Sequence, residues 1–344
     1  MSRFFFIEMG YPNSIIEGFH EVKSGAVPNA ALVQPFSFPP LIRFLNRARY
    51  SRRLRRQLNF VPHRLWSHWH SLRRLPLSED DENFVVLMPG TDIERLILPS
   101  LLRRFRSSRR NVRLILLLFD PINSPLAGNG WDRVREVFPL FDLVATFDKR
   151  DAEALGITHF YDPYGPRDVR TVTGLETDVF FVGHEKGRLD RLCAIADHLR
   201  GASIRFKFLV AGVSDHDKAI AHGLIPLATR LSYDEVLEHV VASRCLLEVL
   251  CEGQTSSSFR YYESVVYNKL LLTDNLRVDE LPCFEPNYVQ RFNEPREIDT
   301  DWIRRNVEVD YRYSGEFSVS NLMSLLEREL SDQSRPPLGG EGGK

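Results

Sequence analysis

The sequence predicts an α/β protein with parallel sheets, built as two domains. Hydrophobic runs of strand length alternate with amphipathic helical runs along most of the 344 residues. Most of the expected strands end at a glycine, proline or aspartate, and the chain is long enough for two hydrophobic cores. Its composition, 43% hydrophobic and 26% charged, is ordinary for a globular protein and excludes disordered, collagen-like and disulfide-scaffold classes.

Four strands are expected in the first half of the chain, each followed by a turn. They are residues 3–9 before Gly10, 84–88 before Pro89 and Gly90, 112–119 before Asp120, and 143–147 before Asp148. Open α/β sheets bind ligands at the carboxyl ends of their strands, so a general base is expected near Gly10, Gly90 or Asp120. Asp120 is the best catalytic candidate, and the competing interpretation is a turn residue before Pro121.

A second α/β series follows a weakly patterned segment at about residues 161–175. Its expected strands are residues 178–183, 204–210, 245–250 and 269–273, and its expected helices are residues 188–200, 232–242 and 258–268. We therefore expect an amino-terminal domain over residues 1–165 and a carboxy-terminal domain over 175–330. Residues 331–344, with four glycines and two prolines, are expected to be a disordered tail.

The charge is unevenly distributed although the formal net charge is only −1. No acidic residue occurs between Glu21 and Glu79, and aromatic side chains are interleaved with the arginines there. Those arginines are Arg43, Arg47, Arg49, Arg52, Arg53, Arg55, Arg56, Arg64, Arg73 and Arg74. Such a stretch fits a solvated helix face, an anionic membrane surface, or RNA or DNA. A possible anionic membrane partner is thus indicated through Arg43–Arg74, whereas the near-neutral total charge makes nucleic acid an unlikely partner.

Several other classes of protein are disfavoured. The four cysteines include no C-x-x-C pair, which indicates reduced thiols and a cytoplasmic location. The run Leu114–Phe119 is far below the roughly 20 apolar residues of a membrane span, and no signal peptide is expected, so any membrane association would be peripheral, at the inner face of the plasma membrane. We expect no metal and no cofactor, because Asp215-His216-Asp217 resembles a polar loop and the histidines near residue 65 lie among arginines. No G-x-S-x-G serine hydrolase motif occurs.

The segment from Leu247 to Glu263 is the richest in chemistry. Four consecutive hydroxyl residues, Thr255, Ser256, Ser257 and Ser258, precede an expected helix whose free N–H groups favour an anion. Arg260 can add a planar pair of donors to a phosphate, and Glu263 can accept two hydrogen bonds from a ribose diol. These residues suit a nucleoside diphosphate. The competing interpretation is a capped helix with an Arg–Glu pair three residues apart.

A second candidate site lies at the turn from Gly183 to Arg188. Two glycines at a strand-to-helix turn allow close backbone approach to a ligand, and Lys186 and Arg188 supply cations for its phosphates. The segment matches neither G-x-x-x-x-G-K-[ST] nor G-x-G-x-x-G, so an ordinary strand-to-helix turn is the alternative.

Together these motifs resemble the donor domain of a known family. They are Phe180-Phe181-Val182-Gly183 with Gly187-Arg188-Leu189, Leu231 to Leu237, and the blocks Leu247–Val249, Glu252–Thr255, Phe259-Arg260, Glu263 and Lys269–Asn275. Over roughly 100 of 344 residues the chain resembles GT-B-fold glycosyltransferases, in particular bacterial proteins of lipopolysaccharide, capsule or exopolysaccharide biosynthesis. In one respect the chain departs from them, because many GT-B enzymes place two glutamates eight residues apart, whereas Glu252 and Glu263 are eleven apart.

The resemblance implies two Rossmann-like domains with parallel sheets facing a cleft. Glu263 would be the ribose-binding glutamate, and the turn from Thr255 to Ser258 the diphosphate loop. The expected function is metal-independent transfer of a sugar from a nucleotide-sugar donor to a glycan or lipid-linked acceptor in bacterial surface polysaccharide biosynthesis. The alternatives are a non-catalytic nucleotide-sugar or polyanion-binding protein of the same fold, and an RNA-binding protein.

Overall fold

The computed structural model contains two compact units. It describes residues 1–9, 17–33, 72, 75–89, 102, 103, 105, 106, 111–119, 135, 137–169, 174–229, 231–251, 254 and 256–333. One unit combines Met1–Pro163 with Val319–Lys344, and the other is Tyr164–Ser318. The chain therefore passes from the first unit to the second and back again. Asp120, Thr255, Glu252 and the arginines from Arg43 to Arg74 lie outside the described residues.

The first unit is built on a six-stranded parallel sheet in the order β2-β1-β3-β4-β5-β6. Its strands are β1 (Ser2–Met9), β2 (Ala30–Val33), β3 (Glu82–Pro89), β4 (Val112–Leu118), β5 (Leu143–Thr146) and β6 (Thr158–His159). The four expected strands are present. The short strands β2 and β6 were not predicted, because two to four residues carry too little periodicity to be recognised.

Apolar side chains cover both faces of this sheet, as a fully parallel sheet requires. Helix α2 (His20–Lys23) and helix α14 (Val319–Gln333) pack on one face. Leu102 and Phe105, with the 3-10 turn η3 (Phe138–Leu140), pack on the other. Helix α8 (Lys149–Leu155) begins at Asp148, whose buried carboxylate accepts a hydrogen bond from the Asp151 N–H at 3.0 Å.

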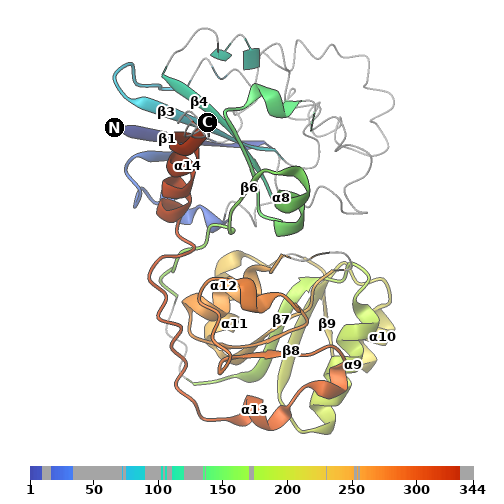
Figure 1. Ribbon diagram of the computed structural model, residues 1–344. Helices are drawn as coiled ribbons and strands as arrows, with labels where there is room; N and C mark the ends of the chain where they lie inside the picture. Colours follow the sequence, from blue (N-terminus) through green and yellow to red (C-terminus); the bar gives the residue numbers. More distant parts are fainter. Residues whose placement is uncertain are drawn as a thin grey trace, which may run out of the picture. The chain divides into compact units, whose positions relative to one another are not determined.

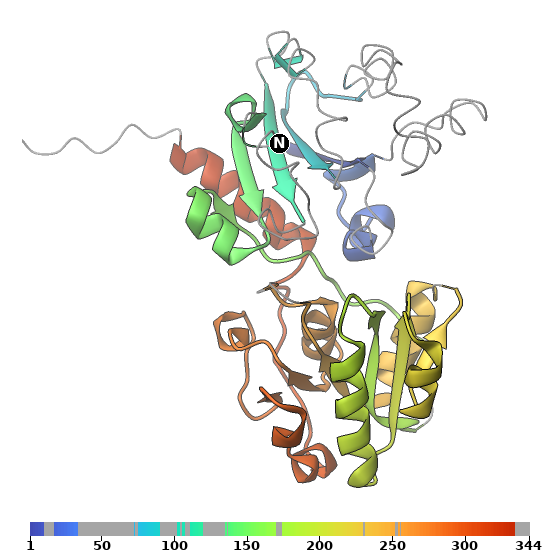
Figure 2. The same ribbon diagram turned by 90° about the vertical axis from the view of Figure 1, so that its right-hand side faces the viewer.

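Helix α14 corrects the expected domain boundary. The sequence placed residues up to 330 in the second domain, but α14 returns to the first unit (Figure 2). Its apolar face explains this, since Val319, Leu322, Met323, Leu326 and Leu330 are buried in the core beside β1, β3, β4 and β5. Residues 331–333 are still helical, although the disordered tail was expected to start at residue 331.

The second unit contains another six-stranded parallel sheet, in the order β12-β11-β10-β7-β8-β9. Its strands are β7 (Thr177–His184), β8 (Phe206–Ala211), β9 (Ile225–Leu227), β10 (Ser243–Glu248), β11 (Leu270–Thr273) and β12 (Val289–Arg291). Counted from its own first strand this is the order 3-2-1-4-5-6 of the Rossmann fold, whose direction of winding reverses between β7 and β10. The expected parallel α/β class is confirmed in both units.

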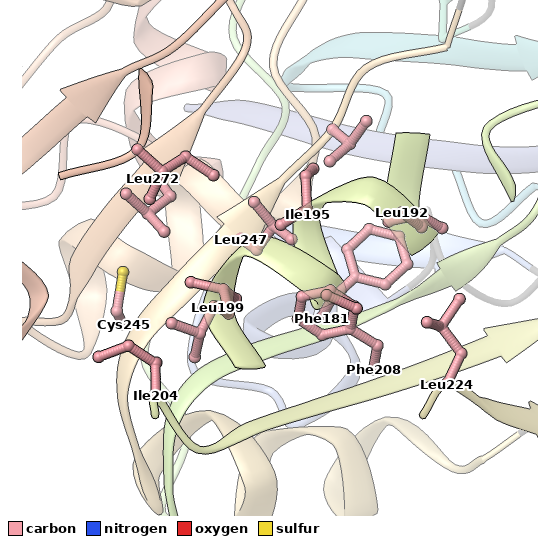
Figure 3. Packing of buried hydrophobic residues seen from close by; sticks show 14 of the residues in the cluster. Phe181, Leu192, Ile195, Leu199, Ile204, Phe208, Leu224, Cys245, Leu247 and Leu272 are labelled. Atoms are coloured by element: carbon pink, nitrogen blue, oxygen red, sulfur yellow. The ribbon is translucent and has the colours of Figure 1, made fainter. Parts of the chain in front are cut away.

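Helices cover both faces of the second sheet (Figure 1). They are α9 (Leu189–Gly201), α10 (His216–Ala221), α11 (Tyr233–Val241), α12 (Phe259–Val266) and α13 (Thr300–Arg304), with the 3-10 turns η4 (Val278–Glu280) and η5 (Pro295–Glu297). Side chains of α9, α10 and α13 share one core with alternate residues of β7, β8, β10 and β11, and Figure 3 shows Leu192 and Leu199 of α9 in that core. On the opposite face, the Phe180 ring of β7 lies 5.4 Å from the His239 ring of α11.

The segment Asp215-His216-Asp217 was expected to be a polar loop, but it forms the start of helix α10. Asp215 is the N-cap of α10, and its side chain accepts a hydrogen bond from the Lys218 N–H at 3.0 Å. Across the described ranges, no helix is long and apolar enough to span a membrane.

Candidate functional site

A pocket of about 580 Å³ opens at the carboxyl edge of the second sheet. Three segments line it: Gly187 and Arg188 of the turn after β7, with Arg191 of α9; Leu250, Cys251 and Gln254 after β10; and Asp274, Asn275, Leu276 and Arg277 after β11. Strands β7 and β10 are the neighbours at which the winding reverses, and β11 is next to them. The pocket thus lies where open α/β sheets bind their ligands.

The turn after β7 forms one wall of the pocket through its backbone and Arg188. Gly187 has φ +79, which favours glycine, and a Cβ on Gly183 would come within 3.2 Å of the Phe181 ring. The Arg188 guanidinium donates to the carbonyl oxygens of His184 and Val249. It therefore joins the ends of β7 and β10. The exposed Lys186 is in the same turn but does not line the pocket.

Asp274 links the other two walls. Its Oδ1 accepts a hydrogen bond from the Leu250 N–H at 2.8 Å, and its Oδ2 lies 3.0 Å from Arg191 Nε. Burial raises the pKa of Asp274, which the Leu250 N–H and the nearby arginines oppose. Arg191 also donates to the Asn293 carbonyl at 2.9 Å. Asp274 thereby fixes the position of the Arg191 guanidinium at the pocket.

The charges of the lining favour an anion. Arg188, Arg191 and Arg277 face one carboxylate, Asp274, so the lining is positive overall. Arg277 is held in place by Glu280, whose two oxygens accept from its guanidinium at 2.8 Å each. Arginine binds phosphate through paired planar donors, and a positive recess concentrates anionic ligands. Within the described ranges, no cluster of three His, Cys, Asp or Glu side chains could hold a metal ion.

The serine-rich loop after β10 points its hydroxyl groups at a buried glutamate. Glu248, the last residue of β10, is fully buried; its Oε1 accepts from the Ser258 N–H at 2.6 Å and the Ser258 hydroxyl at 2.9 Å. Its Oε2 accepts from the Thr273 hydroxyl at 2.6 Å and lies 3.5 Å from the Ser257 hydroxyl. Burial raises the pKa of Glu248, while the hydrogen bonds from Thr273 and Ser258 oppose that rise. An internal carboxylate is therefore bound where the sequence predicted a phosphate.

Arg260 and Glu263 form a buried pair outside the pocket. Arg260 Nη2 lies 2.5 Å from Glu263 Oε1, which also accepts a hydrogen bond from the Tyr233 hydroxyl at 2.7 Å. Glu263 is 0% exposed, and burial raises its pKa against the opposing charge of Arg260. Among the described residues, Arg260 Nη1 and Glu263 Oε2 have no hydrogen-bond partner. The geometry is that of the competing Arg–Glu pair interpretation, and the predicted roles of these two residues as nucleotide ligands stay predictions.

The structure brings one of the predicted binding residues, Arg188, directly into the lining of the pocket. Gly183 lies near the end of β7 and Lys186 in the turn that follows, both outside the lining. The lining also lacks Ser256, Ser257, Ser258, Arg260 and Glu263. Asp120 and Thr255 lie outside the described residues.

Sequence reasoning missed Arg191, Asp274 and Asn275 as site residues. Two signals were available. Arg191 lies one helical turn after Arg188, and Asp274 directly follows a predicted strand.

Comparison with solved structures establishes the fold. An α-glucosyltransferase in complex with UDP and a 13-mer DNA aligns with TM-score 0.59 and 13% identity, over 96% of this chain and 100% of that one. HepE of Anabaena, in complex with UDP and glucose, aligns with TM-score 0.55 and 12% identity over 96% and 99%. The fold is GT-B. A putative UDP-N-acetylglucosamine 2-epimerase from Listeria monocytogenes shares it, with TM-score 0.51 and 9% identity over 97% and 98%.

Sequence comparison adds nothing to this assignment: no family model and no curated protein matches the chain. At these identities the GT-B likeness concerns the fold alone, and the same fold occurs in a transferase and in a putative epimerase. The reaction has to be argued from the site.

Proposed function

We propose that this protein is a glycosyltransferase that uses a nucleotide-sugar donor and binds the donor's diphosphate in the pocket of the second unit. The observation that carries the proposal is the position of three arginines, Arg188, Arg191 and Arg277, at the winding reversal of a Rossmann-type sheet. The likeness to GT-B structures that hold UDP supports it. The Gly183–Arg188 turn contributes close backbone approach to the phosphates.

The chemistry of the proposal is displacement at the anomeric carbon of the donor sugar. The bond from that carbon to the diphosphate oxygen breaks, and the acceptor oxygen forms the new bond. Negative charge grows on the departing diphosphate, where Arg188 and Arg191 stabilise it more in the transition state than in the bound donor. In an inverting reaction a general base takes the acceptor's proton, and Asp120 is the proposed base.

Nucleotide binding and turnover test this proposal separately. UDP, GDP, CMP and dTDP are compared by thermal unfolding, in which a ligand at 100 times its Kd adds about 2.7 kcal/mol of stability. Release of UDP or GDP from sugar donors is then measured with and without glycan acceptors. Stabilisation with acceptor-dependent release supports a transferase. Stabilisation without turnover favours the non-catalytic binder, sugar epimerisation without an acceptor favours an epimerase, and no stabilisation contradicts the donor site.

We further propose a glycan or lipid-linked acceptor of bacterial surface polysaccharide, reached from an anionic membrane surface. The support is the arginine stretch from Arg43 to Arg74, because a surface cation contributes about 1 kcal/mol of attraction to anionic lipid. Changing Arg52, Arg53, Arg55 and Arg56 to glutamine is expected to abolish co-sedimentation with phosphatidylserine-containing vesicles at low salt.

The matched control changes four exposed arginines of the second unit to glutamine: Arg200, Arg291, Arg296 and Arg304. Vesicle binding by the wild type should also weaken in about 1 M salt, where the Debye length is roughly 3 Å. Failure of the wild type to co-sediment contradicts membrane docking, and salt-sensitive retention on RNA in its place favours the RNA-binding alternative.

A further inference from the structure

We infer that Glu248 is a positioning residue that assembles the donor pocket. Its carboxylate fastens the loop after β10 to the loop after β11, and these loops form two of the three pocket walls. The consequence for nucleotide binding rests on the proposed function, whereas the ordering of the two loops does not.

The contacts of Glu248 reach both loops. From the loop after β10, the Ser258 N–H donates to Oε1 at 2.6 Å, and the Ser258 hydroxyl donates to it at 2.9 Å. From the end of β11, the Thr273 hydroxyl donates to Oε2 at 2.6 Å. Ser257 completes the connection, since its hydroxyl lies 3.5 Å from Oε2 and accepts from Asn275 Nδ2 at 2.9 Å. Asn275 lines the pocket.

Each of the three hydroxyl oxygens in this cluster also accepts a hydrogen bond from an N–H group. The Ser258 hydroxyl oxygen accepts from the Arg260 N–H, the Thr273 hydroxyl oxygen accepts from the Asn275 N–H, and the Ser257 hydroxyl oxygen accepts from Asn275 Nδ2. Glu248 is the acceptor for the hydrogen of each of these hydroxyls. In these contacts both carboxyl oxygens of Glu248 accept hydrogen bonds.

Glutamine cannot replace Glu248, although it has the same shape. If its amide nitrogen faces Ser258, it meets an N–H that already donates. If the nitrogen faces Thr273, the Thr273 hydroxyl hydrogen loses its acceptor. A buried donor left without an acceptor is costly, so the loop ends are expected to separate. Asn275 and Gln254 would then leave their positions in the lining, Gln254 because its Nε2 donates to the Ser256 carbonyl of the same loop at 2.8 Å.

The arrangement also explains why the donor phosphates are expected at Arg188 and Arg191. The N–H of the α12 N-cap, Ser258, is already bound by Glu248, and the Arg260 N–H in the first turn is bound by the Ser258 side chain. The helix end is consequently neutralised from inside the protein. Glu248 thus acts on the ligand through the loops and does not contact it.

Four variants of the full chain test the inference: Glu248→Gln, Thr273→Val, Thr273→Ser and Glu235→Gln. Valine keeps the shape of Thr273 without its hydroxyl, and serine keeps the hydroxyl without the methyl. Glu235 is the matched control, because its carboxylate also accepts from the N–H and hydroxyl of an N-cap serine, Ser232 of α11, but on the exposed surface. Each is measured by UDP titration, with GDP if the wild type does not bind UDP, and by amide hydrogen exchange without nucleotide.

Glu248→Gln and Thr273→Val are expected to raise the Kd for the nucleotide at least about 10-fold, equivalent to about 1.4 kcal/mol. Both should speed exchange at the Ser258 and Arg260 amides, while Thr273→Ser and Glu235→Gln stay within about threefold of the wild-type Kd. If Thr273 acted only through packing, the order of the two variants would be reversed, and Thr273→Ser would bind the nucleotide more weakly than Thr273→Val. If Glu248→Gln does not fold, the comparison of Thr273→Val with Thr273→Ser in the same two measurements tests the inference.

Wild-type affinity and wild-type amide protection in Thr273→Val would overturn the inference. If the wild type binds none of UDP, GDP, CMP and dTDP, the proposed function fails, while the amide exchange still shows whether Glu248 orders the two loops.

Discussion

Two loops at the same sheet edge behave in opposite ways. The turn after β7, from Glu185 to Arg188, contains one glycine and three charged residues, and its Gly187 and Arg188 line the pocket. The loop after β10 precedes a helix and is rich in hydroxyl groups, yet its Ser257 and Ser258 bind Glu248, and Arg260 binds Glu263. Polar residues at a helix start indicate a need for hydrogen bonds, and a buried carboxylate meets that need as well as a phosphate does.

The largest expected effect is the loss of stability in Glu263→Ala. Removing this carboxylate leaves the buried Arg260 guanidinium without its partner, and breaking a buried ion pair costs about 3–5 kcal/mol. Urea unfolding measures the change. Glu280→Ala is the control: Arg277 and Glu280 have the same spacing of three residues on the surface, so about 1 kcal/mol or less is expected there. Equal losses in the two variants would show that Glu263 is not buried in solution.

The second effect compares the two loops by ligand affinity. Arg191→Ala removes a pocket cation, and the loss of a charged hydrogen bond, about 1.5–3 kcal/mol, corresponds to a roughly 10- to 150-fold higher Kd for the nucleotide. The control is Arg205→Ala. Arg205 directly precedes β8, at the amino end of that strand and therefore away from the pocket, and it pairs with the Asp178 carboxylate. Arg260→Lys sharpens the comparison. A loss of affinity there as large as in Arg191→Ala, with stability unchanged, would assign the diphosphate to the loop after β10.

The fold could be predicted from the sequence more completely than the contacts of individual side chains. Strands β7, β10 and β11 and helices α9, α11 and α12 were found because periodicity and capping are local signals, such as the Ser232–Glu235 box that begins α11. The direction of the Ser258 hydroxyl depends on Glu248 and Thr273, ten and fifteen residues away in the sequence. Residues 319–330 were assigned to the wrong unit for the same reason, since an apolar helix face such as that of α14 does not specify which sheet it covers.

A smaller effect concerns the thiols. Cys251 lines the pocket, whereas Cys193 and Cys245 are buried and burial raises the pKa of Cys283 to about 12. At pH 8 a maleimide is therefore expected to label Cys251 first. Nucleotide at ten times its Kd should slow that labelling roughly 10-fold, because only the free protein reacts. Labelling of Cys251 that nucleotide does not slow would place the ligand outside this pocket, and Cys251→Ser identifies the labelled site.

The smallest effect is the pH dependence of the buried pair. Burial raises the pKa of Glu263 above its usual 4.5, so the folded chain binds this proton more tightly than the unfolded chain does. The contribution of Glu263 to stability is then greatest below pH 4.5 and falls as the pH rises through the folded pKa, by about 1.4 kcal/mol for each unit of pKa shift. Glu263→Gln cannot titrate at this position. The difference in unfolding free energy between wild type and Glu263→Gln should therefore decrease from pH 4.5 to 7 in urea titrations. A difference that grows with pH would mean that the attraction of Arg260 outweighs burial, and the pair would then favour the charged glutamate at every pH in that range.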